Sequence, residues 1–362
     1  MLHCFSIAQV IDQLETGGAE RVLIDLSNIL QKHGHAVKVI TLVKPGELAS
    51  QLNENIEQVC LQRKWKYNPA IMYRLVQQLK DCDIIHVHSY YNYRYLFIAA
   101  ALFGLRKKIF FHEHHYAERS NEGAGLIKKF ILQKAIFIGV SQRLCKWAEN
   151  IAGIEEKKIF LLKNIIQKQN ISAIQKQNNN SLKLFVASNV SERKNIAFAI
   201  DVCKAMLQSG RKTVLTIVGK IADENYYKLL HQKIADNSLE QHITFIHDCN
   251  NIQPLLPHYD LALHTAFSES GPLVLIEYMA QGLPFITYNT GETVQQVQHD
   301  LPGCIMNSFE LKMWIEKIKA LLNADRKTTQ ILLSKVFEKY FSEDAYYEQC
   351  IKIYEKGIAD TA

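Results

Sequence analysis

Short apolar runs alternate with helix-like stretches along the chain, and this alternation restricts the possible folds more than any other feature. The first half contains FSIAQVI, AVKVITLV, DIIHVHS, KIFFHEH and IFIGVS, which are typical of buried parallel strands. Between them lie stretches such as AERVLIDLSNILQKHG, whose apolar residues recur about every 3.6 positions and which end at Gly34. The pattern predicts a doubly wound α/β domain.

The same alternation starts again after a segment rich in Gln and Asn, Ile165–Ser181. LKLFVAS, VLTIVG, HITFIH, DLALHTA and LPFITYN are the expected strands of the second half. We therefore expect a domain over residues 1–165, a linker over 166–181, a second domain over 182–335, and a helical tail over 336–362 that packs back on the first domain. Ligands should bind at the carboxyl ends of both sheets, facing each other across a cleft.

Composition narrows the class of protein. Of the 362 residues, 48% are hydrophobic and 22% are charged, which is ordinary for a globular chain. No apolar run approaches the roughly 18–20 residues that span a bilayer, and we expect no signal peptide, because no basic segment precedes the first apolar stretch. The eight cysteines form no CxxC pair. This scatter favours reduced thiols and a cytoplasmic protein.

Charge is divided unevenly between the two halves. Residues 1–165 hold 22 Lys and Arg against 15 Asp and Glu, a net charge of +7, whereas the remainder carries −1. The cations are mixed with aromatic or aliphatic residues in RKWKY, YNYRYLF, LRKK and IKKFILQK. Such segments bind an anionic membrane surface or an anionic substrate, or simply form solvated helix faces. Nucleic acid is not an expected partner, because no RRM, zinc-finger or helix-turn-helix pattern occurs.

Two features of the first half are candidate ligand sites. ETGGAER places Gly17 and Gly18 between a strand and a helix, where the backbone can approach a ligand closely or simply turn. Neither GxGxxG nor GxxxxGK[ST] occurs, so the sequence supports neither a dinucleotide fingerprint nor a P-loop. Histidines end two strands, in HVH (86–88) and HEHH (112–115). Strand alternation puts His112 and His114 on one face.

A metal site is one reading of these histidines, but HExxH fails because residue 116 is Tyr. A polar cluster lining the cleft fits better, and an ordinary core histidine remains open for His86.

The second half contains two acids eight residues apart, Glu269 and Glu277, around SGPLVLIEY. If Pro272 is the first helical residue, the helix begins between them. Its free N–H groups and positive dipole end suit a phosphate. Two hydroxyl-binding acids beside an anion site fit a molecule with a sugar at each end of a diphosphate. Arg193 and Lys194 would supply cations to that diphosphate.

Taken in order, these motifs resemble those of the retaining GT-B glycosyltransferases of family 4, also called glycosyl transferases group 1. The matching pieces are GGAER, HEH, the Lys-Asn after the linker, SESGPLVLIEYMAQGLP and NTGE, between about residues 7 and 300. The resemblance implies two Rossmann-like domains in the GT-B arrangement and a hexosyltransferase-type enzyme of the EC 2.4 class. Its substrates would be a UDP- or GDP-linked sugar donor and a glycan or lipid-linked acceptor.

The resemblance also implies roles for individual residues. Glu277 would hold the nucleotide ribose, and Glu269 would contact the donor sugar at its reacting carbon. The remaining roles are phosphate and sugar contacts by the backbone at Gly271, Pro272 and Leu273, diphosphate neutralisation by Lys194 with Arg193, phosphate and acceptor contacts at Gly17 and Gly18, and a histidine beside the reacting sugar, His114 or alternatively His112.

Two positions depart from the family pattern. Ser188-Asn189 stands where Gly-Arg is common, which removes a phosphate-binding arginine that Arg193 would have to replace, and Glu292 stands where a second glycine often follows Gly291. The acid pair is intact. We expect a retaining transferase that needs no metal and no cofactor beyond its nucleotide-sugar substrate, acting in cell-surface polysaccharide synthesis at the inner face of the membrane.

Three alternatives stay open at this point. One is another enzyme on the same scaffold, such as a phosphorylase or an epimerase. Another is a nucleotide-sugar-binding protein without transferase activity. The last is an NAD-dependent dehydrogenase, against which the missing GxGxxG argues.

Overall fold

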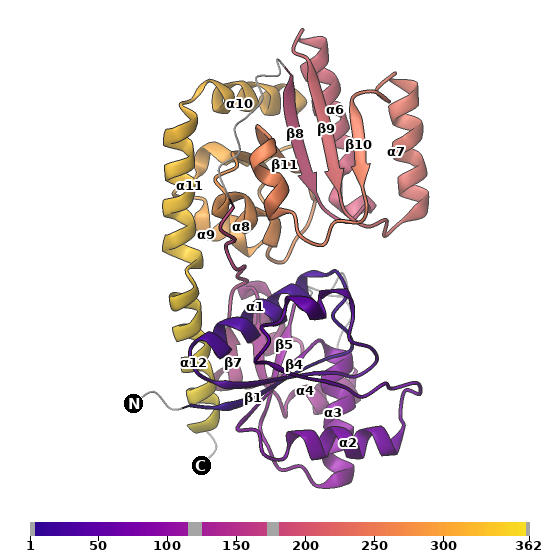
Figure 1. The fold of residues 1–362 in the computed structure, drawn as a ribbon, viewed down its shortest axis with the longest axis vertical. Coiled ribbons are helices and arrows are strands. Elements are labelled where there is room, and N and C mark those ends of the chain that lie inside the picture. The colour runs from indigo at the N-terminus through magenta and orange to yellow at the C-terminus, as the bar shows by residue number, and fades with distance from the viewer. Residues whose placement is uncertain (1–3, 115–124, 172–180, 360–362) are drawn as a thin grey trace. The chain divides into compact units, whose positions relative to one another are not determined.

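The computed structural model describes residues 4–114, 125–171 and 181–359. The chain forms two compact units, which we call unit 1 (residues 1–166 and 343–362) and unit 2 (residues 167–342). Each is a parallel sheet covered by helices, so the two doubly wound domains expected from the sequence are confirmed (Figure 1).

The boundaries of the units differ in detail from the expected ones. Gln167 and Gln169 at the start of the expected linker hydrogen-bond through their backbone to Gln253 of unit 2, and residues 172–180 of that linker lie outside the described residues. The expected boundary at residue 335 falls inside α11 (Arg326–Phe341), and the chain passes into unit 1 after Ser342.

Unit 1 contains a seven-stranded sheet of order β3-β2-β1-β4-β5-β6-β7, in which every pairing is parallel. Its strands are β1 (Ser6–Ile11), β2 (Ala36–Thr41), β3 (Glu57–Cys60), β4 (Ile84–His88), β5 (Ile109–Glu113), β6 (Ile136–Gly139) and β7 (Ile159–Leu161). The order reverses between β1 and β4, and ligands of such sheets bind outside the carboxyl ends at this point.

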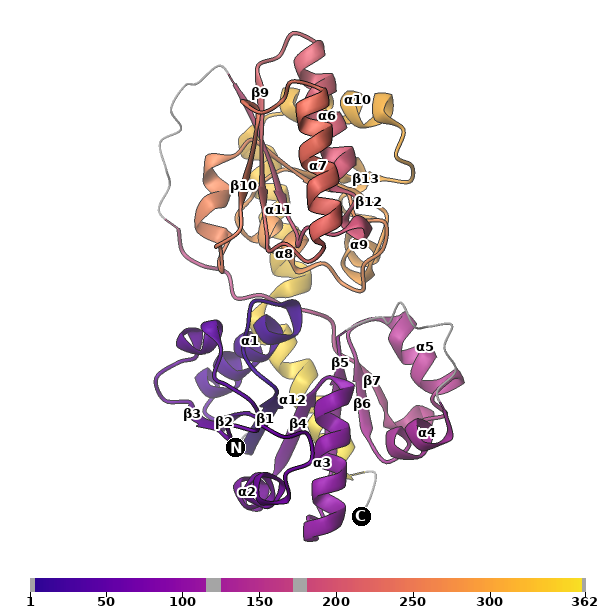
Figure 2. The same ribbon diagram turned by 90° about the vertical axis from the view of Figure 1, so that its right-hand side faces the viewer.

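Helices cover both faces of this sheet. One face packs on α1 (Gly18–Lys32) and on α12 (Glu343–Ala359), which comes from the far end of the chain (Figure 1). The other packs on α2 (Pro69–Leu79), α3 (Tyr90–Phe103), α4 (Leu126–Leu132) and α5 (Gln142–Asn150), with α2 and α3 side by side (Figure 2). Short 3-10 turns η1 (Glu47–Gln51) and η2 (Glu156–Lys158) complete the unit.

Unit 2 contains a six-stranded parallel sheet of order β10-β9-β8-β11-β12-β13. Its strands are β8 (Leu182–Ala187), β9 (Thr213–Val218), β10 (Ile243–Ile246), β11 (Leu261–His264), β12 (Phe285–Tyr288) and β13 (Ile305–Met306). Its helices are α6 (Ile196–Gln208), α7 (Glu224–Asp236), α8 (Leu273–Ala280), α9 (Glu292–Val297), α10 (Leu311–Asn323) and α11, with 3-10 turns η3 (Glu192–Lys194), η4 (Gln253–His258) and η5 (Pro302–Cys304). The strand order reverses between β8 and β11.

The apolar runs correctly locate the interior strands and the edge strand β10, but do not reveal β3, β7 and β13. These three are edge strands and are only two to four residues long. An edge strand is partly exposed, so its sequence need not be continuously apolar.

The carboxyl edges of the sheets carry unusual backbone. Gln62, Ser89 and Asn195 have φ of +55°, +72° and +50°, and they follow β3, β4 and η3 respectively. Non-glycine residues in this region store strain that concentrates at functional sites. Among the described helices, none combines the length and the apolar character needed to cross a bilayer.

Candidate active site

Two loops meet at the reversal point of the unit 2 sheet. One follows β8 and ends in η3, and the other follows β11 and leads into α8. The backbone N–H of Phe267 donates to the carbonyl of Arg193 at 2.9 Å, and the Thr265 hydroxyl donates to the carbonyl of Lys194 at 3.1 Å. Asn195 then turns the chain into α6. These contacts bring residues 193–194 beside residues 265–269.

The centre of this arrangement is an ion pair between the Lys194 ammonium and a Glu269 carboxylate oxygen, Oε1. The two side chains are only 16% and 12% exposed. Because both charges are poorly solvated, each is stabilised by the other. Removing either partner would leave an unpaired charge in a poorly solvated site. The structure therefore joins two residues that the sequence singled out separately.

His264, which sequence reasoning missed, lies on the other side of Glu269. Its Nε2 is 3.5 Å from the same oxygen, Oε1, which is an electrostatic contact rather than a short hydrogen bond. Its Nδ1 is 2.9 Å from the Thr287 hydroxyl. Burial opposes the charge on Glu269, but the His264 and Lys194 contacts outweigh it and lower the pKa of Glu269 to about 2. The sequence signal that could have identified His264 was a polar residue at the end of a predicted buried strand.

A third loop fixes the backbone around Glu269. The Glu269 N–H donates to the Thr290 hydroxyl at 3.0 Å, and the Glu292 N–H donates to the Ser270 carbonyl at 2.7 Å. Gly291 between them has φ +86°, and a Cβ there would lie 2.7 Å from Pro272 Cδ. The NTGE glycine is thus required both by its backbone conformation and by the closeness of the segment before α8.

Helix α8 begins at Leu273, with Pro272 as its N-cap, so the expectation that Pro272 is the first helical residue is wrong by one position. The hydroxyl of Tyr278 accepts from the N–H of Ala187 at 3.2 Å, which ties α8 to the end of β8. Glu277 lies on the buried side of α8 and is 3% exposed. The N-terminal N–H groups of α8 follow Gly271 directly and suit an anion.

Arg193 is exposed, one residue before the buried pair. Its carbonyl braces the second loop through Phe267.

In unit 1, Gly17 is the N-cap of α1 and Gly18 is its first residue. Gly17 has an extended backbone, φ −164°, so no left-handed turn requires it. A Cβ at Gly17 would collide with the carboxylate of Glu20. The N-terminus of α1, where the sequence suggested a phosphate, therefore has the Glu20 carboxylate beside it. An incoming anion would have to displace that side chain.

The strand-end histidines of unit 1 form one buried cluster. His86 Nδ1 is 2.7 Å from the Tyr354 hydroxyl of α12, and His86 Nε2 is 3.1 Å from His112 Nδ1. His88 Nδ1 is 2.8 Å from His114 Nε2. The rings of His112 and His114 lie 4.1 Å apart, which agrees with the expectation that they share a face. His115 is outside the described residues.

Hydrogen bonds order this cluster. His88 Nε2 is 2.8 Å from Gln9 Oε1, so with the amide placed this way His88 donates from Nε2 and accepts at Nδ1 from His114. Burial lowers the pKa of His86 to about 3 and lowers that of His88 well below its usual value, where His86 and His114 add to the effect. These imidazoles are neutral at pH 7.

The nitrogens of His86, His88 and His112 lie within 4.8 Å of one another, which is compact enough for a metal. Their contacts with each other, Gln9 and Tyr354 already use most of the ring nitrogens. A metal would have to break these bonds, so the geometry favours the polar cluster.

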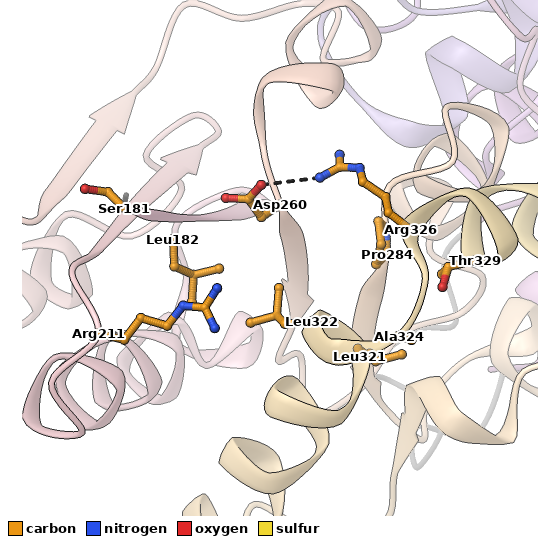
Figure 3. A pocket seen from close by; sticks show the side chains of 10 residues that line it. All are labelled: Ser181, Leu182, Arg211, Asp260, Pro284, Leu321, Leu322, Ala324, Arg326 and Thr329. Carbon is orange, nitrogen blue, oxygen red and sulfur yellow. Dashed lines mark hydrogen bonds and ion pairs between the residues drawn. The ribbon is translucent and has the colours of Figure 1, made fainter. Parts of the chain in front are cut away.

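A cavity of about 340 Å³ in unit 2 lies at the opposite, amino edge of its sheet (Figure 3). Leu182 at the start of β8 and Pro284 before β12 line it, and Arg326 reaches Asp260 at 3.3 Å. Doubly wound sheets bind ligands at the carboxyl edge. The cavity is therefore separate from the candidate active site.

The chain is similar to known glycosyltransferases along most of its length. Residues 167–332 match the family described as Glycosyl transferases group 1, and residues 16–169 match Glycosyltransferase Family 4. An uncharacterized glycosyltransferase of Haemophilus influenzae is 23% identical over 94% of this chain and 96% of its own. The N-acetyl-alpha-D-glucosaminyl L-malate synthase of Bacillus anthracis is 24% identical over 79% of this chain and 80% of its own.

Among solved structures, Anabaena HepE in complex with UDP and glucose superposes with a TM-score of 0.77 at 19% identity. The match covers 97% of this chain and 99% of that one. At this identity the likeness concerns the fold.

Proposed function

Since the chain is a glycosyltransferase with the GT-B fold, we propose that it transfers a sugar from a nucleotide diphosphate sugar to a glycan or lipid-linked acceptor with retention of the anomeric configuration. The observation that carries this proposal is the shielded Lys194–Glu269 pair beside the N-terminus of α8. It combines a cation, an ionised acid and backbone N–H groups where a doubly wound sheet binds its ligand. The HepE complex supports UDP as the first nucleotide to test.

The donor diphosphate would meet Lys194, Arg193 and the backbone at Gly271–Leu273. Charge develops on this diphosphate as the glycosidic bond breaks, and fixed donors that match such charge lower the barrier. Lys194 would turn from Glu269 to the phosphate when donor binds. His264 would then remain beside Glu269, which keeps that carboxylate ionised and directed at the donor sugar.

Glu277 would hold the ribose hydroxyls, and its burial in α8 supports a fixed acceptor of hydrogen bonds. In unit 1, Gly17 and Gly18 would contact phosphate or acceptor, with Glu20 moving away. His114 is the last member of a hydrogen-bonded series that runs from Gln9 through His88, and this series fixes the orientation of its ring. It is 8% exposed whereas His112 is fully buried, so we assign the active-site role to His114.

The proposed reaction needs no divalent metal, because cations and N–H groups can balance the leaving diphosphate. The single DxD triplet of the sequence, Asp81-Cys82-Asp83, precedes β4 at the amino edge of the sheet. There the Asp83 carboxylate accepts from the Ser6 N–H at 2.8 Å. It is thus used structurally, away from the carboxyl edge.

Retention would follow a front-face route in which a donor phosphate oxygen takes the acceptor proton and no protein nucleophile is used. A covalent glycosyl adduct trapped on Glu269 and seen by mass spectrometry would refute this route.

The protein would bind an anionic membrane surface through α4, and a lipid-linked acceptor would lie at that surface. Leu126, Ile127 and Phe130 are 59–86% exposed, and Lys128 and Lys129 lie between them. Apolar side chains mixed with cations suit the interface of an anionic membrane. This supports binding at a membrane surface, and the role we propose there is polysaccharide synthesis at the inner face. Unchanged binding of Lys128→Gln/Lys129→Gln to phosphatidylglycerol vesicles would contradict it.

A panel of UDP, GDP, ADP and NAD tests the donor by thermal shift. Ligand that binds only the folded state adds RT ln(1 + [L]/Kd), or about 2.7 kcal/mol at 100 times Kd. We expect UDP to give the largest shift and Glu277→Ala to lose it. Proton NMR of the first product then reports retention, and activity in EDTA reports metal independence. A shift with NAD alone would refute the proposal.

A further inference from the structure

A second cavity, of about 400 Å³, lies within unit 1. Its walls come from the segment after β3, residues 63–67, and from the first turns of α3, residues 91–95. These are the RKWKY and YNYRYLF motifs, which are about thirty positions apart in the sequence. Residues after β1 and β2, Asp12 and Val43, complete the lining, so the cavity opens at the carboxyl edge of the sheet.

The cavity is strongly cationic. Arg63, Lys64, Lys66 and Arg94 line it, against a single carboxylate, Asp12. Asp12 is already paired with Arg63 at 2.7 Å. Several positive charges around one open cavity attract an anion and raise the rate at which it is captured.

Aromatic rings form the rest of the wall. Trp65, Tyr67 and Tyr91 are 76%, 45% and 60% exposed. The Arg94 guanidinium donates to the Tyr67 hydroxyl and lies 5.9 Å from the centre of its ring, which holds that ring in place. Flat amphipathic rings present an apolar surface with a polar edge, a combination that matches the C–H faces and hydroxyls of a sugar.

The hydroxyl of Tyr95 is an unpaired polar group at this cavity, among the residues that the structure describes. Tyr95 lines the cavity at 2% exposure, under the Arg63 guanidinium at 4.6 Å, and its hydroxyl has no hydrogen-bond partner in the part of the chain that the structure describes. Buried hydroxyls are nearly always bonded. Gln62, directly before Arg63, also has the strained φ of +55°.

We propose that this cavity binds a sugar residue of the acceptor that carries a negative charge, either a phosphate or a carboxylate. The assignment rests on the proposed transferase function and names the class of its acceptor. Lys66 and Arg94 would contact the anionic group, because neither is paired with a carboxylate in the described structure, while the exposed rings stack on the sugar. Charge-assisted contacts from Arg select phosphate and carboxylate.

Calorimetric titration with matched probes tests the assignment. Trigalacturonate and its methyl ester have the same rings and differ in charge, and glucose 6-phosphate and glucose are the corresponding phosphate pair. We expect at least one charged member to bind at least tenfold more tightly than its neutral partner, as the loss of one charge-assisted hydrogen bond predicts. Which pair shows the preference decides between carboxylate and phosphate.

The double variant Lys66→Gln/Arg94→Gln should lose this preference. The matched control Arg74→Gln/Lys80→Gln removes two exposed cations from α2 and its end, outside the cavity, and should keep it. Equal binding of charged and neutral probes, or an unchanged preference in the first variant, would overturn the assignment. So would binding of phosphatidylglycerol vesicles that depends on Lys66 and Arg94 when neither charged sugar binds.

UDP binding separates this test from that of the proposed function. UDP should shift the melting temperature of both double variants as it shifts that of the parent. A charged-sugar preference in a protein that UDP fails to stabilise would support the cavity and contradict the proposed donor.

Discussion

Lys194→Met probes the buried pair most directly. The substitution keeps an unbranched apolar stem of similar reach and removes the ammonium that faces Glu269. Breaking a buried pair by removing one partner typically costs 3–5 kcal/mol. A second calculation starts from Glu269 itself, whose pKa lies at about 2 instead of 4.5. At 1.36 kcal/mol per unit this corresponds to about 3 kcal/mol, shared between Lys194 and His264. We therefore expect a loss of about 2–3 kcal/mol at pH 7.

The depressed pKa of Glu269 also determines how the loss of stability depends on pH. Because the folded pKa of Glu269 is depressed, its stabilisation is fully present above about pH 4.5 and is lost as the pH falls toward 2. In Lys194→Met the folded pKa rises, so the deficit of the variant should be largest above pH 5 and should shrink between pH 5 and 3.

Urea unfolding followed by Trp314 fluorescence measures this effect. Trp314 is buried in the core of unit 2, and replacing Trp65 and Trp147 by Phe removes the two signals from unit 1. A cycle with Glu269→Gln and the double variant isolates the pair. We expect a coupling energy of about 1–3 kcal/mol. A coupling below about 0.5 kcal/mol, or a deficit that does not change with pH, would refute the argument.

Three further substitutions follow from the same structure. His264→Leu should destabilise unit 2 by about 1 kcal/mol above pH 5, because the Glu269 carboxylate loses the imidazole beside its Oε1; equal stability at all pH values in urea unfolding would speak against the contact. Gly291→Ala forces a side chain into φ +86° and against Pro272, so we expect a loss of about 1–3 kcal/mol and weaker UDP binding, whereas normal UDP affinity would separate this loop from the site. Gly357→Ala puts a Cβ 2.5 Å from the Phe110 ring, so unit 1 should lose about 1–3 kcal/mol in unfolding followed by Trp147 fluorescence; full stability would mean that α12 does not pack closely on the sheet.

The sequence was sufficient for the fold class and for the interior strands. Buried parallel strands are apolar along most of their length, so runs such as FSIAQVI and LKLFVAS reveal them directly. The acid pair around α8 was equally visible, because glycine and proline mark the start of a helix. Short strands such as β13 were not predicted, because a two-residue edge strand is too short to show a periodic pattern.

Only the tertiary structure decided which separated residues meet. Lys194 and Glu269 are 75 positions apart, and His264 gave no motif, yet the reversal of strand order between β8 and β11 brings the three together. The same holds for RKWKY and YNYRYLF around one cavity of unit 1. Local sequence patterns record which surfaces of a segment are buried, since burial is a property of each segment. Which segments become neighbours depends on the order of strands in the sheet, and that order is a property of the whole chain.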